Sequence, residues 1–223
     1  MKKILVFDVN ETLLDLKALD PEFERIFGNV LVRQQWFSQF IQSALVSLIT
    51  NTYTPFGVIG VAALEMMAKR CDIPLEELDK KAILSKLVSL PAHTEVPKAL
   101  AKLKVSGYTI AALTNSTQEV AEKQLRNAGI IKHFDKILSA DSIKSLKPAK
   151  QVYEMAANNF SVKTEQIRLI AAHAWDIAGA LRAGCAAAFI ARPGMVLDPL
   201  VEKPDIVGKD LISVADQIIE IDK

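Results

Sequence analysis

An acidic residue ends the first apolar run of this 223-residue sequence. Residues 4–6, Ile-Leu-Val, lead into the stretch FDVNETLLD, which contains Asp8 and, four residues later, Thr12. A carboxylate at the end of a strand can act as a nucleophile, ligate a metal ion, or cap the turn that follows. This stretch alone does not separate the three roles, so the other chemically active residues must decide.

Polar side chains also follow three later predicted strands. They are two hydroxyls with an amide, an ammonium group, and an imidazole with a second carboxylate: Thr114, Asn115, Ser116, Lys147, His173 and Asp176. In an open parallel sheet, ligands bind beyond the carboxyl ends of the strands. We therefore expect these side chains to converge on Asp8, with Lys147 as the counter-charge that keeps the acid ionised.

The spacing of apolar residues predicts the elements that position these groups. Short apolar runs predict strands at residues 3–8, 108–113, 136–139, 168–172, 187–191 and 206–207. Helices are predicted between and after them at residues 96–105, 118–127, 148–159, 177–183 and 214–219, with Pro148 in a first helical turn. Alternating strands and helices predict an α/β fold with a Rossmann-like, doubly wound parallel sheet.

The segment between the first two strands has a different pattern. Apolar residues recur there at helical spacing, and helices are predicted around residues 21–27, 36–48, 62–68 and 75–90. We therefore predict a core domain made of residues 1–15 and 91–223, with residues 16–90 inserted as a helical-bundle cap domain.

Charge and composition narrow the class of protein. The 27 Lys and Arg residues nearly balance the 26 Asp and Glu residues, which gives no basic footprint for nucleic acid or an anionic membrane. Cys71 and Cys185 cannot build a disulfide framework and favour a reducing compartment. The apolar window 169–191 contains Asp176 and Arg182, each costing at least ~2.5 kcal/mol at mid-bilayer. The first apolar run is also too short for a signal peptide. The sequence thus predicts a cytoplasmic protein without a membrane span.

Taken in order, the motifs resemble those of the haloacid dehalogenase superfamily. They are Asp8-x-x-x-Thr12, the strand-terminal triplet 114–116, Lys147-Pro148 and Asp176. The segments KPAKQVYEMA and WDIAGALRAGC further resemble the type II 2-haloacid dehalogenase branch. This resemblance implies a cap inserted after the first strand, and members of the branch often form homodimers.

Two positions distinguish this chain from the Mg²⁺-dependent phosphatases of the superfamily. Asn10 stands where those phosphatases have a second aspartate as general acid, and Ala172 stands where they have an aspartate that binds Mg²⁺. An amide cannot exchange a proton at neutral pH, and Mg²⁺ requires hard oxygen ligands. We therefore expect no metal and no cofactor.

The resemblance implies a metal-independent substitution at C2 of a small 2-haloalkanoic acid. Asp8 would displace halide and form an ester that water hydrolyses, with Thr12 steadying Asp8. Asp176, with His173, would orient the water or Lys147. Substrate contacts are expected from several other side chains, which are Asn10, Arg33, Thr114, Asn115, Ser116, Tyr153 and Trp175.

The chain departs from the branch at three of these positions. Arg33 lies one place from the expected position of the halide-binding arginine, and the family's Ser-x-Asn before the last aspartate is Ala171 and His173 here. Two alternatives therefore stay open: a Mg²⁺-dependent phosphatase of a small phosphomonoester, and a catalytically impaired binding protein. Asp176 could also cap a helix that begins at Ile177. His93 and His133 are interpreted as ordinary loop or helix-end residues.

Overall fold

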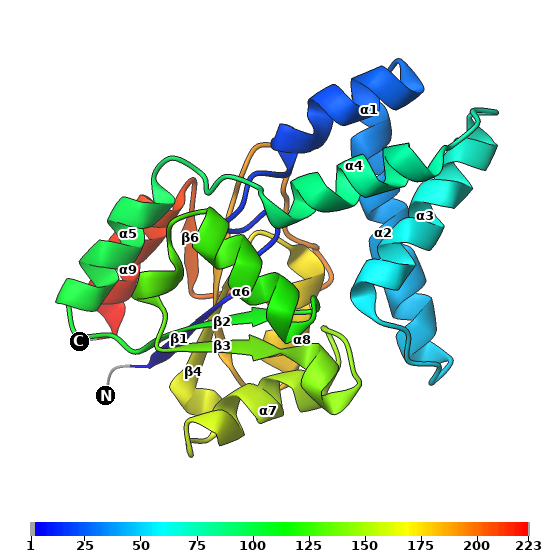
Figure 1. Ribbon diagram of the computed structural model, residues 1–223. Coiled ribbons are helices and arrows are strands. Elements are labelled where there is room, and N and C mark those ends of the chain that lie inside the picture. Colours follow the sequence, from blue (N-terminus) through cyan, green and yellow to red (C-terminus); the bar gives the residue numbers. More distant parts are fainter. Residues whose placement is uncertain (1–2, 223) are drawn as a thin grey trace.

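The computed structural model describes residues 3–222, and a parallel sheet forms its centre (Figure 1). The six strands have the order β3-β2-β1-β4-β5-β6. Their bounds are Ile4–Phe7 for β1, Ile110–Thr114 for β2, Lys136–Ser139 for β3, Ile167–Ala171 for β4, Ala186–Ile190 for β5 and Ile206–Gly208 for β6. The order reverses between β1 and β4, so their carboxyl ends flank the crevice where ligands of doubly wound sheets bind.

Helices cover both faces of this sheet. They are α5 (Val96–Val105), α6 (Gln118–Asn127), α7 (Lys150–Asn159), α8 (Ala174–Arg182) and α9 (Leu211–Ile221). Leu5 and Phe7 of β1 pack in one apolar cluster with α5 and α9, whereas Val6 packs in another with α7 and α8. Successive strand residues point to opposite faces, so a continuous apolar run indicates a strand covered on both sides. The predicted doubly wound α/β fold is confirmed.

Four helices between β1 and β2 lie to one side of the sheet (Figure 1). They are α1 (Asp20–Phe27), α2 (Leu31–Ile49), α3 (Phe56–Arg70) and α4 (Glu77–Val88), preceded by a 3₁₀ turn, η1 (Leu16–Leu19). We call α1–α4 the four-helix segment. Helices α2 and α3 pack closely because Gly60 leaves room for the Phe40 ring, which would lie 2.8 Å from a Cβ atom at that position.

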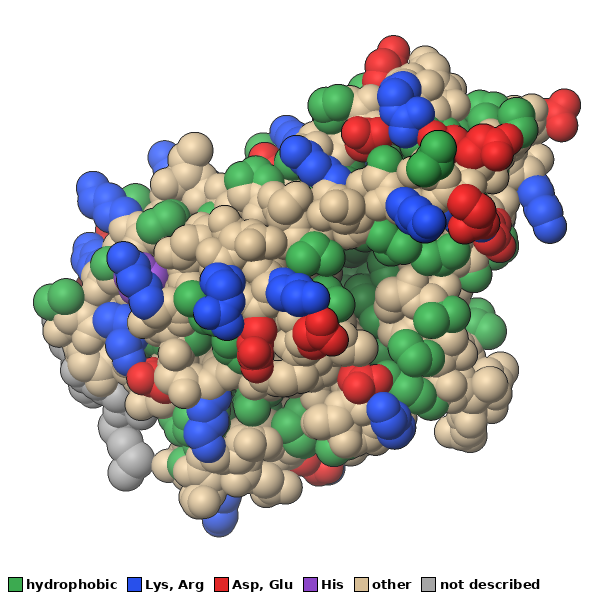
Figure 2. All heavy atoms as spheres, viewed as in Figure 1, with side chains coloured by type: hydrophobic (Ala, Val, Ile, Leu, Met, Phe, Trp, Pro, Cys, Tyr) green, Lys and Arg blue, Asp and Glu red, His purple; other side chains and the backbone are tan. Residues whose placement is uncertain are grey.

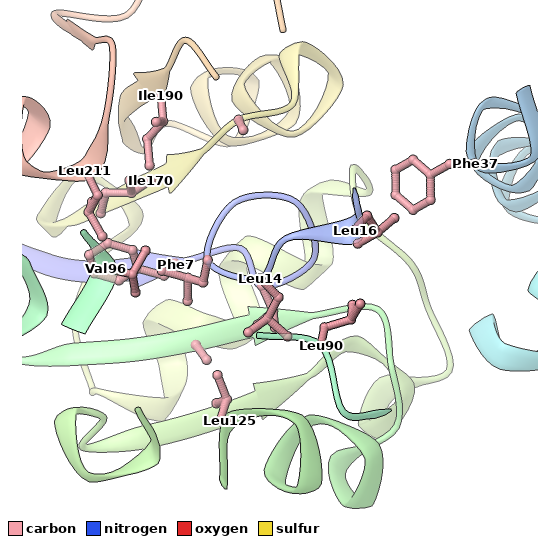
Figure 3. Close-up of a cluster of buried hydrophobic side chains, with 14 of the residues drawn as sticks. Phe7, Leu14, Leu16, Phe37, Leu90, Val96, Leu125, Ile170, Ile190 and Leu211 are labelled. Carbon is pink, nitrogen blue, oxygen red and sulfur yellow. The ribbon is translucent and has the colours of Figure 1, made fainter. Parts of the chain in front are cut away.

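The apolar contacts continue from the sheet into the four-helix segment. Leu14 and Leu16 follow β1, and Figure 3 shows them lying between Phe7 of the sheet and Phe37 of α2. Leu90, after α4, belongs to the same cluster. The two connections to the segment are therefore themselves buried, which fixes where α2 lies relative to the end of β1.

Some predicted boundaries were wrong. Helix α8 begins at Ala174, so Asp176 lies in its first turn and does not cap a helix that starts at Ile177. Helix α7 begins at Lys150, after Pro148, because Ala149 has an extended backbone with ψ of 133°. Helices α2 and α3 begin earlier than expected, and their first turns already contribute buried residues, among them Val32 in α2 and Phe56 and Ile59 in α3.

Three further 3₁₀ turns complete the chain: η2 (Ile131–His133), η3 (Ala140–Ile143) and η4 (Thr164–Gln166). Within residues 3–222, no helix combines the length and the apolar character needed to span a bilayer.

A buried arginine ties the C-terminus to the sheet and yields a stability prediction. Arg168 of β4 is fully buried and donates to Asp222 at 2.8 and 2.9 Å and to Asp205 at 2.6 and 2.9 Å. In the R168M variant, the buried Asp222 carboxylate loses its counter-charge. We expect a loss of about 3 kcal/mol in the free energy of unfolding, measured by urea denaturation.

The matched control is Asp205→Asn, because the Asp205 side chain is 48% exposed and its ion pair is screened by water. That change should cost less than about 1 kcal/mol. An R168M variant as stable as the wild type would contradict the role of this ion pair.

Candidate active site

A buried ammonium group lies between two carboxylates at the carboxyl ends of β1 and β4. The Nζ atom of Lys147 is 2.7 Å from Oδ1 of Asp8 and 2.6 Å from Oδ2 of Asp176. All three residues are at most 5% exposed. Asp8 follows β1 directly, and its backbone N–H donates to the carbonyl of Ile170 in β4 at 3.0 Å. The sheet therefore fixes the position of Asp8 through its backbone.

Hydrogen bonds hold both carboxylates in place. The Thr12 hydroxyl donates to Oδ2 of Asp8 at 2.6 Å and accepts from the backbone N–H of Ala172 at 2.9 Å. The Tyr153 hydroxyl donates to Oδ1 of Asp176 at 2.6 Å. Thr12 and Tyr153 thus each donate to one of the two carboxylates, and Oδ1 of Asp8 accepts from Lys147.

His173 joins Asp8 to a third acid that the sequence interpretation did not include. Its Nδ1 lies 3.1 Å from Oδ2 of Asp8, and its Nε2 lies 2.9 Å from Oε2 of Glu11. Glu11 has a φ of 59°, a conformation that non-glycine residues seldom adopt and that is often found at functional sites. The sequence contained one sign that Glu11 belongs to the site: it precedes Thr12 and lies in the same short stretch as Asp8.

These contacts set the charges of the site. Burial alone would raise the pKa of Asp8, but Lys147 and His173 hold it well below its ordinary value. Burial would lower the pKa of His173, but the carboxylates of Asp8 and Glu11 raise it to about 9. Burial, with the Asp8 carboxylate adding to it and Lys147 opposing, raises the pKa of Asp176. Asp8 is therefore an ionised carboxylate facing two cations at neutral pH.

A narrow compartment adjoins Asp8. It has a volume of about 10 Å³. Its walls come from both parts of the chain: Asp8, Asn10, Phe37, Ile41, Phe56, Thr114, Asn115, Lys147, His173 and Trp175. The His173 ring is stacked between Phe37 and Trp175, with ring centroids 5.8 and 5.1 Å apart. A ligand that reaches Asp8 must therefore displace aromatic side chains.

Three other predicted contact residues lie at this compartment. Oδ1 of Asn115 accepts from the backbone N–H of Lys147 at 2.7 Å, so this residue positions the lysine. Asn10 is held by the Nε2 group of Gln124 at 3.1 Å, and Thr114 accepts from the backbone N–H of Ser116 at 3.1 Å.

Three predicted contact residues lie elsewhere, and one of them is Tyr153, which binds Asp176. Ser116 is buried, but it is absent from the walls of the compartment because the chain turns away after Asn115. Arg33 donates through Nε to Asp20, and its Nη1 is 3.9 Å from Glu11. Its side chain lines a larger neighbouring cavity of about 730 Å³, as do Arg192 and His93. His93, interpreted as an ordinary loop residue, thus lies near the site.

The donor set does not fit Mg²⁺. Both oxygens of Asp176 are engaged, by Lys147 and Tyr153, and Lys147 places its charge between the two carboxylates where a cation would lie. Ala172 supplies no side-chain oxygen. Since Mg²⁺ needs several hard oxygen ligands in octahedral order, the arrangement provides for an ammonium group in place of a metal ion.

The chain resembles known proteins over nearly its whole length. A family model described as haloacid dehalogenase-like hydrolase matches residues 5–190. Haloacetate dehalogenase H-2 from Moraxella sp. (strain B) is 25% identical over 225 residues, with 99% of each chain covered. (S)-2-haloacid dehalogenase H-109 from Pseudomonas putida is 23% identical, with 97% of each covered.

A solved structure has the same fold. The L-2-haloacid dehalogenase from Xanthobacter autotrophicus with chloropropionic acid covalently bound has a TM-score of 0.92 at 20% identity. The match covers 99% of this chain and 100% of that one.

The His173 contacts predict a pH-dependent stability. The pKa of His173 is raised from 6.5 to about 9 in the folded protein, so its stabilising effect is complete below pH 6.5 and is lost as the pH rises through 9. We expect the free energy of unfolding to fall by about 3 kcal/mol over this range in the wild type. Urea denaturation at pH 6, 7.5 and 9 measures it.

The H173N variant serves as the control, since its side chain does not titrate in this range. Its stability should vary less with pH than that of the wild type. Parallel pH profiles for the two proteins would show that His173 does not gain its proton from these carboxylates.

Proposed function

Because this chain belongs to the haloacid dehalogenase-like hydrolase family, we propose that it hydrolytically removes halide from a small 2-haloalkanoic acid. The observation that carries this proposal is the ionised Asp8 carboxylate, held by Lys147, Thr12 and His173, with an amide at Asn10 in the same stretch. Relatives that act on haloacetate and (S)-2-haloacids agree with the proposal.

In the first step, Oδ1 of Asp8 attacks C2 of the substrate. A C–O bond forms, the carbon–halogen bond breaks, and halide leaves with the bonding electrons. No proton is needed, which suits the amide at Asn10. Holding the carboxylate against C2 supplies an effective molarity of ~10⁵ M or more. Lys147 offsets the repulsion between the substrate carboxylate and the carboxylate of Asp8.

In the second step, water attacks the carboxyl carbon of the Asp8 ester. His173, which loses its resting proton to solvent once Asp8 is esterified, accepts a proton from that water and returns it to the alkoxide oxygen as the C–O bond to the protein carbon breaks. This releases a 2-hydroxy acid, and Asp8 gives up its remaining proton to solvent and becomes a carboxylate again. Glu11 stabilises the resulting imidazolium, because its carboxylate is 2.9 Å from Nε2. Once Asp8 is an uncharged ester, one of the two carboxylates that raise the pKa of His173 is gone. The imidazole thus becomes a base at the point where a base is needed.

Asn115, Thr114 and Asn10 lie where the carboxylate or the departing halide would bind. Asn115 faces the compartment and also holds the Lys147 backbone. Trp175 and Phe56 provide an apolar wall for the halide. Arg33 is held by Asp20 outside this compartment and lines the larger neighbouring cavity.

We propose that residues 16–90 act as a cap domain over a core of residues 1–15 and 91–223. Phe37, Ile41 and Phe56 of the four-helix segment support this, since they wall the compartment at Asp8. The family resemblance and the exposed apolar residues Val46 and Ile49 favour a homodimer, which sedimentation velocity tests. The free cysteines Cys71 and Cys185 favour the cytoplasm.

Halide release should continue in the presence of a chelator and cease in the D8N variant. Removing the nucleophilic charge leaves no covalent route, so we expect a loss of at least ~10³-fold in kcat. The assay measures halide released from a panel of L- and D-2-haloacids and haloacetates, with and without EDTA.

Parallel assays with small phosphomonoesters test the two alternatives. Phosphate release that needs Mg²⁺, with no halide release, would replace the proposal with a phosphatase. Inactivity in both panels, together with measurable binding of 2-haloacids, would indicate a catalytically impaired binding protein.

The H173Q variant should stall after the first step. Without a base for the water, the ester on Asp8 is hydrolysed more slowly by a factor of ~10²–10⁴, and kcat falls accordingly. Intact-protein mass spectrometry during turnover should show a chain heavier by the substrate acid without its halide. A variant with unchanged kcat and no such adduct would remove His173 from the mechanism.

A further inference from the structure

A second cavity lies on the other side of the aromatic wall from Asp8. It has a volume of about 730 Å³ and lies between α2, the turn after β1 and the loop after β5. Phe37, Ile41, His173 and Trp175 line both this cavity and the narrow compartment at the nucleophile. The two spaces are thus separated only by side chains. On the face shown in Figure 2, the surface is also hollowed between the four-helix segment and the rest of the molecule, with hydrophobic side chains on the walls of the hollow.

Two buried arginines line this cavity, one from each part of the chain. Arg33 of α2 is 5% exposed, and Arg192, which follows β5, is 7% exposed. They converge on neighbouring residues, because Arg33 lies 3.9 Å from Glu11 and Arg192 donates to the carbonyl of Thr12 at 2.6 and 3.0 Å. The same turn holds Asp8 through the Thr12 hydroxyl.

Neither guanidinium uses all of its donors. Arg33 donates through Nε to Asp20, and Arg192 uses Nε and Nη2 for Thr12 and Glu95. Nη2 of Arg33 and Nη1 of Arg192 have no protein partner among residues 3–222. Among residues 3–222, the only fully buried polar side-chain atom without a hydrogen-bond partner is Oε1 of Gln124, so neither of these Nη atoms is fully buried. The unused Nη groups are therefore accessible to a small ligand, and both arginines line the cavity.

Unpaired guanidinium donors in a confined space favour an anion with planar oxygen pairs, such as a carboxylate. The walls between these arginines and the aromatic side chains include Leu16, Ile41, Leu45 and Met195, which suit a short methylene chain. A ligand that fits both features has an apolar middle and an anionic end.

We propose that this cavity binds a second carboxylate of the substrate, so that the enzyme prefers 2-halodicarboxylic acids. C2 and its carboxylate reach Asp8 past the Phe37–His173 contact, and the distal carboxylate binds Arg33 and Arg192. This inference rests on the proposed dehalogenation. An anion held by both arginines also connects α2 to the loop after β5.

The test compares kcat/KM for 2-chloro diacids of four to six carbons with monoacids of equal length. At one chain length, the wild type should prefer the diacid by about 10-fold or more, since hydrogen bonds to charged groups contribute this much to binding. The Q42E variant adds a negative charge to the exposed cavity wall and should lower this preference several-fold. The matched neutral change, Gln42→Met, should preserve it.

Binding without turnover provides an independent measurement. In the D8N variant, calorimetry compares succinate, glutarate and adipate with the corresponding monoacids. Tighter binding of one diacid, weakened when Q42E is added and preserved when Q42M is added, supports the second carboxylate site even if no haloacid is hydrolysed.

The possible failures are distinguishable. Turnover of monoacids as fast as diacids, with equal binding of both classes, overturns this inference and leaves the dehalogenase proposal intact. Absence of halide release from every acid overturns the dehalogenase proposal, and the calorimetric comparison then decides the anion site by itself.

Discussion

The position of the Lys147 ammonium group between Asp8 and Asp176 is the constraint on which the rest of the site depends. Three charges with almost no exposure cost several kcal/mol each to remove from water, and only close pairing offsets this. The distances of 2.6 and 2.7 Å provide that pairing. Since like carboxylates repel, Asp8 and Asp176 can both lie near the same point only because Lys147 lies between them. The arrangement lowers the stability of the fold, and it keeps the Asp8 carboxylate ionised.

The sheet order explains why these charges meet. Asp8 leaves β1 and Asp176 lies shortly after β4, and the two strands are neighbours at the point where the winding reverses. The Thr12 hydroxyl links the two strand ends, since it contacts both Asp8 and the backbone of Ala172. Thr12 and Ala172 are 160 residues apart in the sequence, and the pairing of β1 with β4 brings them into direct contact.

Much of this could be predicted from the sequence, for reasons that apply to particular residues. Buried parallel strands have continuous apolar runs, so the ends of β1 and β4 are visible, and polar residues at those ends belong to the site. The start of α8 was not visible, because Ala174 and Trp175 are compatible with a strand end or a helix turn. Sequence spacing therefore left a helix cap open beside the site role of Asp176, and the contacts with Lys147 and Tyr153 show what its carboxylate binds.

Residues that depend on contacts between the two parts of the chain could not be predicted in this way. Arg192 and Phe37 lie on elements whose relative position is fixed by side-chain packing around Leu14 and Leu16, which no periodicity encodes. Arg33 was identified as a cation near the site, but the direction in which its side chain points depends on its ion pairs with Asp20 and Glu11. Its place in the larger cavity follows from these partners and not from its position in the helix.

His173 shows how a substitution within a family pattern changes the electrostatics of the whole site. An asparagine there would be neutral throughout the reaction, but an imidazole between Asp8 and Glu11 has a pKa that depends on the charge of Asp8. While Asp8 is ionised, the proton on His173 stabilises the nucleophile in a buried space. When Asp8 is esterified, it has no negative charge for the imidazolium to stabilise, and only Glu11 still favours the protonated form of His173. A single residue can therefore support an anion in one half of a reaction and act as a base in the other, because the charge that controls it is the one that the reaction removes.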